Sequence, residues 1–138
     1  MALVRGTCIS MNGQAVLLRG PSGAGKSDVA LRLIDEGAKL VADDNTEVTL
    51  KNNIALASPP KTVAGLLEVR GLGIMTLPHE TGVPLALVVD FVAREDVPRM
   101  PGKDMADIAG IQVTRLSLHA FDASTPAKIR LALTQKSA

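Results

Sequence analysis

Short β-rich runs separated by turn-forming residues dominate the first half of the chain. Residues 3–11 and 14–18 are joined by Asn12-Gly13, and residues 46–58 contain a second pair of runs around Asn52-Asn53. A two-residue hairpin turn needs positive φ at both central residues, which Asn and Gly adopt readily. The pattern therefore predicts two β-hairpins.

The apolar spacing changes to that of a helix after residue 27. The apolar positions that recur there at helical spacing are Val29, Ala30, Leu33 and Ile34. Gly37 follows as a C-terminal stop. A second helix is predicted in residues 124–136, with Ser124 or Thr125 as its cap and Pro126 in its first turn.

The remaining apolar runs predict further strands. Residues 38–44 read as a buried strand that ends in two acids, and further strands are predicted at 66–69, 74–77 and 85–91. Residues 93–110 are charged and punctuated by proline, which predicts a loop. Hairpins outnumber strand–helix–strand crossovers, so we expect an α/β domain with a mixed, largely antiparallel sheet.

Length and composition limit the number of domains, the type of core and the partners that we expect. A chain of 138 residues predicts one domain, residues 1–138, with 46% hydrophobic residues for its core. There are two Phe and no Trp or Tyr, so the core is aliphatic and offers no aromatic platform for single-stranded nucleic acid. The net charge of +1 gives no basic face for DNA, and nucleic acid is not an expected partner.

The single cysteine, Cys8, excludes an internal disulfide and lies in an apolar run, which favours a buried structural thiol. No apolar run approaches the roughly 18 residues of a membrane span, and the N-terminus has no signal-peptide core. We therefore expect a soluble cytoplasmic protein without a membrane partner.

The segment GPSGAGKS fits the phosphate-loop pattern G-x-x-x-x-G-K-[ST] in full. It consists of Gly20, Pro21, Ser22, Gly23, Ala24, Gly25, Lys26 and Ser27. The glycines let the main chain close around phosphate oxygens at the positive end of the following helix. Lys26 supplies a full charge to the outer phosphates and Ser27 offers a hydroxyl to Mg²⁺. The loop predicts nucleotide binding but does not identify the phosphate acceptor.

Acids that could act on the bound phosphates end two apolar runs. Asp43 and Asp44 follow one run, and Asp90 follows the other. Because side chains alternate along a strand, Asp43 and Asp44 are expected to face different ways. The alternative is that the pair serves only in a turn or as a helix cap.

The segment LLEVRGLGIM places Glu68 and Arg70 on one face of a strand end. This arrangement would set an acid for a metal beside a cation for phosphate. A surface ion pair on an edge strand explains the same pattern. The residues alone leave both interpretations open.

Together, GPSGAGKSD, GAKLVADD and LLEVRGLGI resemble the catalytic C-terminal domain of HPr kinase/phosphorylase, in the order found in that family. The family phosphorylates a serine of the phosphocarrier protein HPr, which links it to the phosphotransferase system and carbohydrate metabolism. It can also remove the phosphate with inorganic phosphate. The resemblance implies a fold similar to phosphoenolpyruvate carboxykinase, ATP and Mg²⁺ as cofactors, an HPr-like partner and a homo-hexamer.

The resemblance also implies roles for individual residues. The phosphate loop would hold ATP, with Lys26 on the phosphates, Ser27 and Glu68 on Mg²⁺, and Arg70 as the signature cation beside the metal ligand. Asp44 is favoured as the group that accepts the serine proton, with Asp43 close behind. An ionised carboxylate within hydrogen-bond reach of the hydroxyl suits that role. Arg99, in RMP, is matched to an arginine that touches the transferred phosphate.

The chain departs from the family pattern at two places. Arg5 stands where a histidine is expected, 21 residues before the loop lysine, and an arginine cannot shuttle a proton. A late loop tied to phosphorolysis has only PGKD, residues 101–104, as a counterpart. Both departures put its phosphorylase activity in question. Because the chain lacks the N-terminal domain of the long family members, it resembles the short, catalytic-domain-only forms of α-proteobacteria.

Two other functions fit the phosphate loop. One is a small-molecule kinase with Asp90 as its metal ligand, which predicts a parallel sheet and a lid domain. The other is a non-catalytic ATP sensor. His79 and His119 have no partners at metal-ligand spacing and are expected to be structural or exposed.

Overall fold

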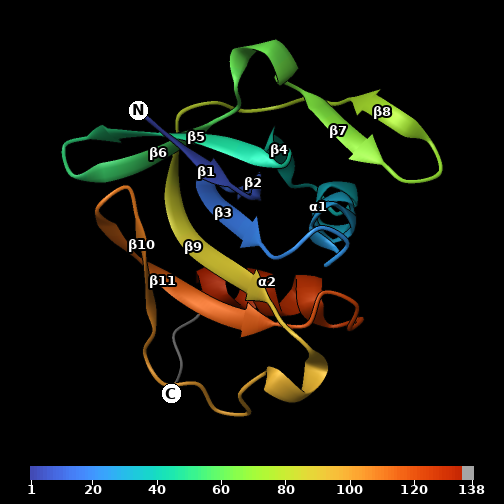
Figure 1. The fold of residues 1–138 in the computed structure, drawn as a ribbon, viewed down its shortest axis with the longest axis vertical. Coiled ribbons are helices and arrows are strands. Elements are labelled where there is room, and N and C mark those ends of the chain that lie inside the picture. Colours follow the sequence, from blue (N-terminus) through green and yellow to red (C-terminus); the bar gives the residue numbers. More distant parts are fainter. Residues whose placement is uncertain (135–138) are drawn as a thin grey trace.

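The computed structural model describes residues 1–134, in which two helices pack beside a curled β-sheet (Figure 1). The helices are α1 (Lys26–Asp35) and α2 (Thr125–Thr134), with short 3₁₀ turns η1 (Lys61–Val63) and η2 (Arg94–Asp96). The strands are β1 (Ala2–Arg5), β2 (Thr7–Met11), β3 (Gln14–Arg19), β4 (Lys39–Ala42), β5 (Asn45–Lys51), β6 (Ile54–Ser58), β7 (Leu66–Val69), β8 (Gly73–Thr76), β9 (Val83–Phe91), β10 (Met105–Ile108) and β11 (Ile111–Leu118).

The main sheet has the strand order β1-β5-β6-β9-β3-β2-β4, and β11 joins β9 and carries β10. Only the β3–β9 and β9–β11 pairs are parallel among the described strand pairs. β7 and β8 form a separate hairpin. The prediction of a mixed, largely antiparallel sheet is therefore confirmed.

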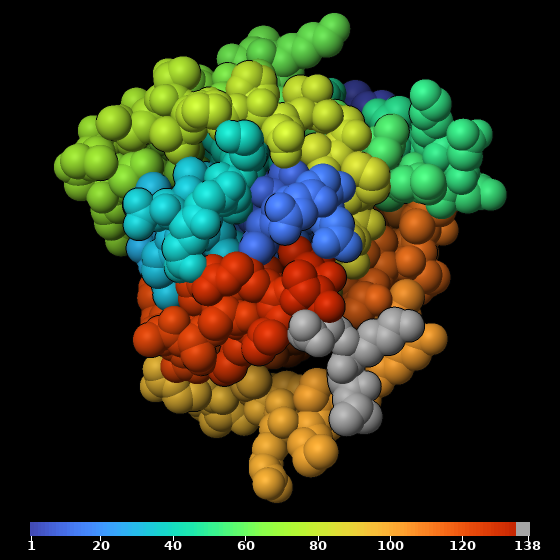
Figure 2. Space-filling model, turned by 180° about the vertical axis from the view of Figure 1, so that it is seen from behind, coloured from blue at the N-terminus to red at the C-terminus, as the bar shows by residue number. Residues whose placement is uncertain are grey.

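The central strand β3 is buried on both faces because its side chains alternate between two apolar clusters. Val16 and Leu18 pack with residues of both helices, and α1 and α2 lie side by side on the surface seen from behind (Figure 2). Ala15 and Leu17 pack on the other face with Cys8, which is fully buried as expected. The strand that leads into the phosphate loop is thus fixed by packing on both sides.

The predicted turns form as the sequence indicates. Asn12, Gly13, Asn52 and Asn53 have φ values of 51°, 77°, 53° and 62°. Helix α1 begins at Lys26, and the Gly37 N–H donates to the Ile34 carbonyl at 3.0 Å just past its end. These features depend on local backbone preferences.

Two predictions about strands are wrong. Residues 3–11 form two strands rather than one, because the chain bends at Gly6 and sends β1 to β5 and β2 to β3 and β4. A Cβ on Gly6 would lie 2.9 Å from the Leu18 carbonyl oxygen, so the bend requires glycine. Residues 93–110 are not a loop throughout, because β10 pairs with β11 and buries Ala106 and Ile108.

Helix α2 begins at Thr125 with Pro126 in its first turn, as predicted. The predicted end of this helix, Gln135 and Lys136, lies outside the described residues. Neither α1 nor α2 is long and apolar enough to cross a membrane.

Candidate active site

The phosphate loop connects β3 to α1 at the edge where the parallel strands end. Gly23 and Gly25 have φ values of 82° and 98°, and the Ala24 N–H donates to the Pro21 carbonyl at 3.0 Å. The Lys26 ammonium donates to the carbonyls of Gly20 at 2.6 Å and Pro21 at 3.0 Å. The loop therefore holds its lysine over its own main chain, at the N-terminus of α1 where anions are favoured.

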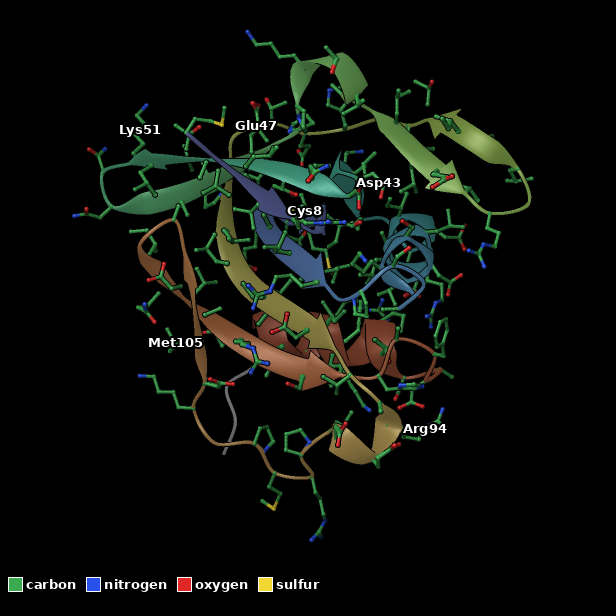
Figure 3. All side chains as sticks on the ribbon, viewed as in Figure 1. Cys8, Asp43, Glu47, Lys51, Arg94 and Met105 are labelled. Atoms are coloured by element: carbon green, nitrogen blue, oxygen red, sulfur yellow. The ribbon has the colours of Figure 1, made fainter. Side chains whose placement is uncertain are left out.

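Asp43 joins three separate elements at the loop. Its Oδ1 accepts hydrogen bonds from Ser27 Oγ at 3.0 Å and Thr7 Oγ1 at 3.1 Å, and its Oδ2 accepts one from the Glu68 backbone N–H at 3.1 Å. Figure 3 shows Asp43 between β4, α1 and β7. The carboxylate is thus fixed beside the hydroxyl that follows the loop lysine.

Asp44 sits at the centre of a strained turn. It has φ 65°, and the Asn45 N–H donates to the Asp43 carbonyl at 2.7 Å across it. This is the rarer, positive-φ kind of γ-turn, and such strained residues cluster at functional sites. The two acids diverge, as expected, but the left-handed turn causes the divergence and not the pleat of a strand, because β4 ends at Ala42.

Thr7 holds both acids at once. Its hydroxyl donates to the Asp43 carboxylate and accepts from the Asp44 N–H at 3.3 Å. The Asp44 carbonyl accepts from the Gly6 N–H at 2.8 Å. Thr7 is 1% exposed, so its hydroxyl is a fixed part of the site. Sequence reasoning missed it, because a threonine in a strand carries no signal of such a contact.

A cleft of about 370 Å³ lies beside the loop. Its lining residues are Arg5, Gly6, Arg19, Gly20, Pro21, Ser22, Lys26 and Asp44. Three cationic side chains against one carboxylate make the cleft suited to an anion. Arg5 and Asp44 are 4.0 Å apart with side chains 85% and 64% exposed, so their pairing is weak and leaves both groups available.

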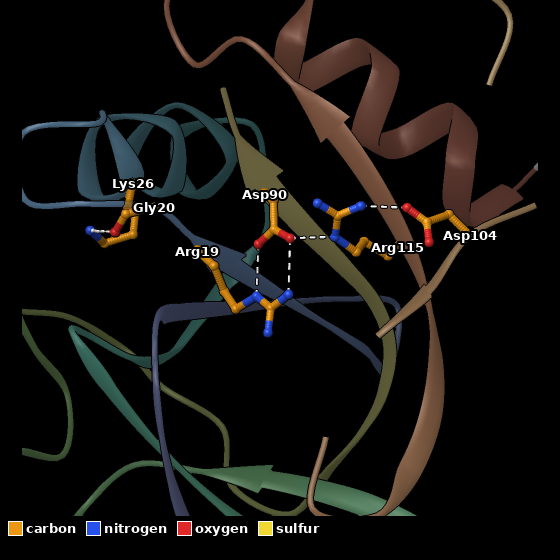
Figure 4. Close-up of polar contacts among 6 residues, drawn as sticks. All are labelled: Arg19, Gly20, Lys26, Asp90, Asp104 and Arg115. Atoms are coloured by element: carbon orange, nitrogen blue, oxygen red, sulfur yellow. Dashed lines mark hydrogen bonds and ion pairs between the residues drawn. The ribbon is translucent and has the colours of Figure 1, made fainter. Parts of the chain in front are cut away.

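Arg19, which lines this cleft, belongs to a chain of charges that crosses the parallel strands (Figure 4). Its Nε and Nη2 donate to Asp90 at 2.7 and 2.9 Å, and Arg115 donates to the same carboxylate at 2.5 Å. Arg115 also pairs with Asp104. Burial alone would raise the pKa of Asp90, but the hydrogen bonds from Arg19 and Arg115 outweigh it and hold that pKa below its ordinary value.

Three other predicted site residues, Glu68, Arg70 and Arg99, do not line the cleft. Glu68 reaches the site through its backbone, while its side chain is exposed on β7, and Arg70 is exposed in the turn that follows. Arg99 is exposed between η2 and β10, and neither arginine lines the cleft. Arg19 is the residue that the sequence could have indicated, because it directly precedes the loop.

The oxygen donors present suit Mg²⁺. The Ser27 hydroxyl and the Asp43 carboxylate are within 3.0 Å of each other, and the backbone N–H of Glu68 donates to the same carboxylate. Residues 1–134 contain no cluster of three or more His, Cys, Asp or Glu side chains arranged to hold a metal. Mg²⁺ in nucleotide sites is held by one or two protein oxygens together with phosphates and waters, so this donor set fits.

The histidines lie apart from this donor set. His119 Nδ1 is 3.0 Å from the Val92 carbonyl oxygen, and His79 pairs through its backbone with Leu40. His79 is exposed and His119 is partly buried. Both positions agree with a structural or exposed role.

The structure thus combines a curled, mostly antiparallel sheet with a phosphate loop and a neighbouring acid pair. The family model described as the HPr Serine kinase C-terminal domain matches residues 1–117, and the chain belongs to this family. The resemblance drawn from the three motifs is confirmed.

A solved structure shows the same fold over nearly the whole chain. The chain is similar to the Hpr(Ser) kinase/phosphatase from Coxiella burnetii, with a TM-score of 0.85 and 24% sequence identity. The match covers 96% of this chain and 94% of that one. The mixed sheet, the phosphate loop and the two helices therefore form a known architecture.

Proposed function

We propose that the chain is an ATP- and Mg²⁺-dependent kinase that phosphorylates a serine of an HPr-type phosphocarrier. Family membership supports the class of reaction. The observation that carries the proposal is the bridge from Ser27 through Asp43 to Thr7 and Asp44 beside Lys26. A cytoplasmic location and a hexameric assembly, both expected from the resemblance, belong to the same proposal.

Each residue of the site has a separate role in the proposed reaction. Lys26 and the loop N–H groups would hold the phosphates, and Ser27 and Asp43, with Glu68, would hold Mg²⁺, which neutralises charge on the transferred group when bound. Asp44 would accept the proton of the serine hydroxyl as its oxygen bonds to phosphorus and the bond to ADP breaks. Its 64% exposure leaves the carboxylate open to a protein substrate.

Arg5 lines the same cleft as Asp44, 4.0 Å from its carboxylate, and carries a permanent charge. It would attract the phosphoryl group without moving a proton. This favours the kinase direction over removal of the phosphate from the carrier.

The direct test uses the purified protein, γ-labelled ATP, Mg²⁺ and an HPr-type carrier. We expect label on the carrier serine, and none on a carrier whose serine is replaced by alanine. Asp44→Asn should lower kcat by about 10²- to 10⁴-fold, the range for loss of a general base, while ADP binding is retained. Failure to label the carrier at high protein concentration would refute the proposal.

The same variant separates the kinase from an ATP sensor, because a sensor with Asp44→Asn would keep its response to ATP.

The small-molecule kinase is less favoured for two reasons. It predicts a parallel sheet, whereas the described sheet is mostly antiparallel, and Asp90 is already engaged by Arg19 and Arg115.

A further inference from the structure

The loop after β11, residues 119–122, lies directly against the phosphate loop. β3, β9 and β11 are parallel neighbours, so their carboxyl ends meet at one edge. A Cβ built on Gly25 would lie 2.7 Å from the Ala120 Cβ and 3.0 Å from Cζ of the Phe121 ring. Ligands of such sheets bind in the crevice outside the carboxyl ends of the strands.

Hydrogen bonds from both helices hold the backbone of this loop. Arg32 of α1 donates to the carbonyls of Ala120 at 2.5 Å and Asp122 at 3.3 Å. The Thr125 hydroxyl donates to the His119 carbonyl at 2.5 Å. The backbone on both sides of Phe121 is therefore held beside the phosphate loop.

Phe121 is nevertheless exposed. Its side chain is 58% accessible, whereas Phe91, the other phenylalanine, is 6% accessible and belongs to the core. His119 meets the Phe121 ring edge-on, with centroids 5.8 Å apart and an interplanar angle of 73°. An aromatic ring with free surface beside a phosphate loop is suited to stacking on a flat π system.

The direction of the bound nucleotide follows from the strand order. The acids that would receive the transferred phosphate follow β4, on one flank of β3, and the Phe121 loop follows β11, on the opposite flank beyond β9. A nucleotide with its terminal phosphate at Asp43 and Asp44 would extend its base away from them, toward β11.

We propose that Phe121 is the stacking surface for the base of the nucleotide. The inference rests on the proposed function, because it requires that the phosphate loop binds a nucleotide. It goes further by assigning the base to the 119–122 loop. Recognition by one ring face depends on the π system of the base and not on its hydrogen-bonding groups.

The test compares the affinities of ADP and pyrophosphate, both measured by calorimetry with Mg²⁺. Phe121→Ala should weaken ADP binding by about 5- to 150-fold, the range for loss of one base–aromatic stack. It should leave pyrophosphate binding unchanged. Leu131→Ala is the matched control, because Leu131 is also 58% exposed but lies on α2, and it should change neither affinity.

A second variant keeps an aromatic ring at position 121 and reports base stacking through its fluorescence. The chain has no tryptophan, so Phe121→Trp introduces a single fluorophore. We expect ADP to quench its emission and pyrophosphate to leave it unchanged.

If Phe121→Ala binds ADP as tightly as the unaltered protein, the base site is wrong while the proposed function stands. If the unaltered protein binds neither ADP nor pyrophosphate, the proposed function fails and the base site fails with it.

Discussion

At the scale of single residues, the site depends on how two adjacent acids are held differently. Asp43 is fixed by three hydrogen bonds, and Asp44 projects into the cleft from a left-handed turn. A fixed acid suits the metal side and an exposed acid suits proton transfer. Thr7 orients both, so we treat it as a positioning residue.

Thr7→Val removes the hydroxyl but keeps the shape of the side chain. We expect kcat for carrier phosphorylation to fall by about 10- to 100-fold, as for a small displacement of catalytic groups, with little change in the KM for ATP. Steady-state kinetics would measure both constants. Thr7→Ser should restore most of kcat.

Thr46→Val is the control, because Thr46 is equally buried and its hydroxyl bonds to the Gly6 carbonyl instead of an acid. An equal loss of kcat in both valine variants would show that Thr7 acts only through stability.

At the scale of elements, the β3–loop–α1 unit could be predicted because it is local. Strand, glycine loop and helix follow one another in the chain, and each has its own signal. The Arg19–Asp90–Arg115 chain could not be predicted, since its members lie on β3, β9 and β11. Parallel pairing places Arg19 opposite Asp90. It also places Arg115 opposite Val88, two residues before Asp90 on the same face of β9, so the three charged side chains meet.

Asp90→Asn tests this chain through stability. The folded pKa of Asp90 lies below its unfolded value, so its contribution to stability is present at neutral pH and is lost as the pH falls through the folded pKa. We expect the variant to lose about 1.5 to 3 kcal/mol of unfolding free energy at pH 7, and less at pH 3. Urea unfolding at both pH values measures this.

The exposed Arg94–Asp122 pair gives the comparison, and Arg94→Gln should change the unfolding free energy little at pH 7. A loss in Asp90→Asn that is the same at both pH values would contradict the charge-based explanation.

At the scale of the whole molecule, the proposed ligand would contact the phosphate loop and the loops on both of its flanks. The phosphate loop, the acids after β4 and the 119–122 loop come from three regions of the chain. A ligand that binds only the folded state raises stability in proportion to its occupancy. Nucleotide should therefore stabilise the entire fold.

Adding ADP with Mg²⁺ at about 100 times its Kd should contribute about 2.7 kcal/mol and raise Tm by roughly 10 °C. Chelation of Mg²⁺ should reduce the shift, and Lys26→Ala should abolish most of it. Lys128→Ala, on α2, should keep the full shift. Differential scanning fluorimetry gives these values, and a full shift in Lys26→Ala would exclude the phosphate loop as the binding site.

The sequence by itself determined the features that nearby residues encode. The hairpin turns, the phosphate loop and the start of α1 follow from the φ preferences of Asn and Gly and from short-range apolar spacing. The motif order also identified the family, because three short patterns rarely occur together.

Only the tertiary structure decided which side chains meet. Thr7, Ser27 and Asp43 are far apart in the chain and come together because β2 pairs with β4 and α1 packs on the sheet. The exposure of Phe121 beside Gly25 has the same origin, since it depends on β11 pairing with β9. Such contacts arise from long-range pairing, which no local preference along the chain specifies.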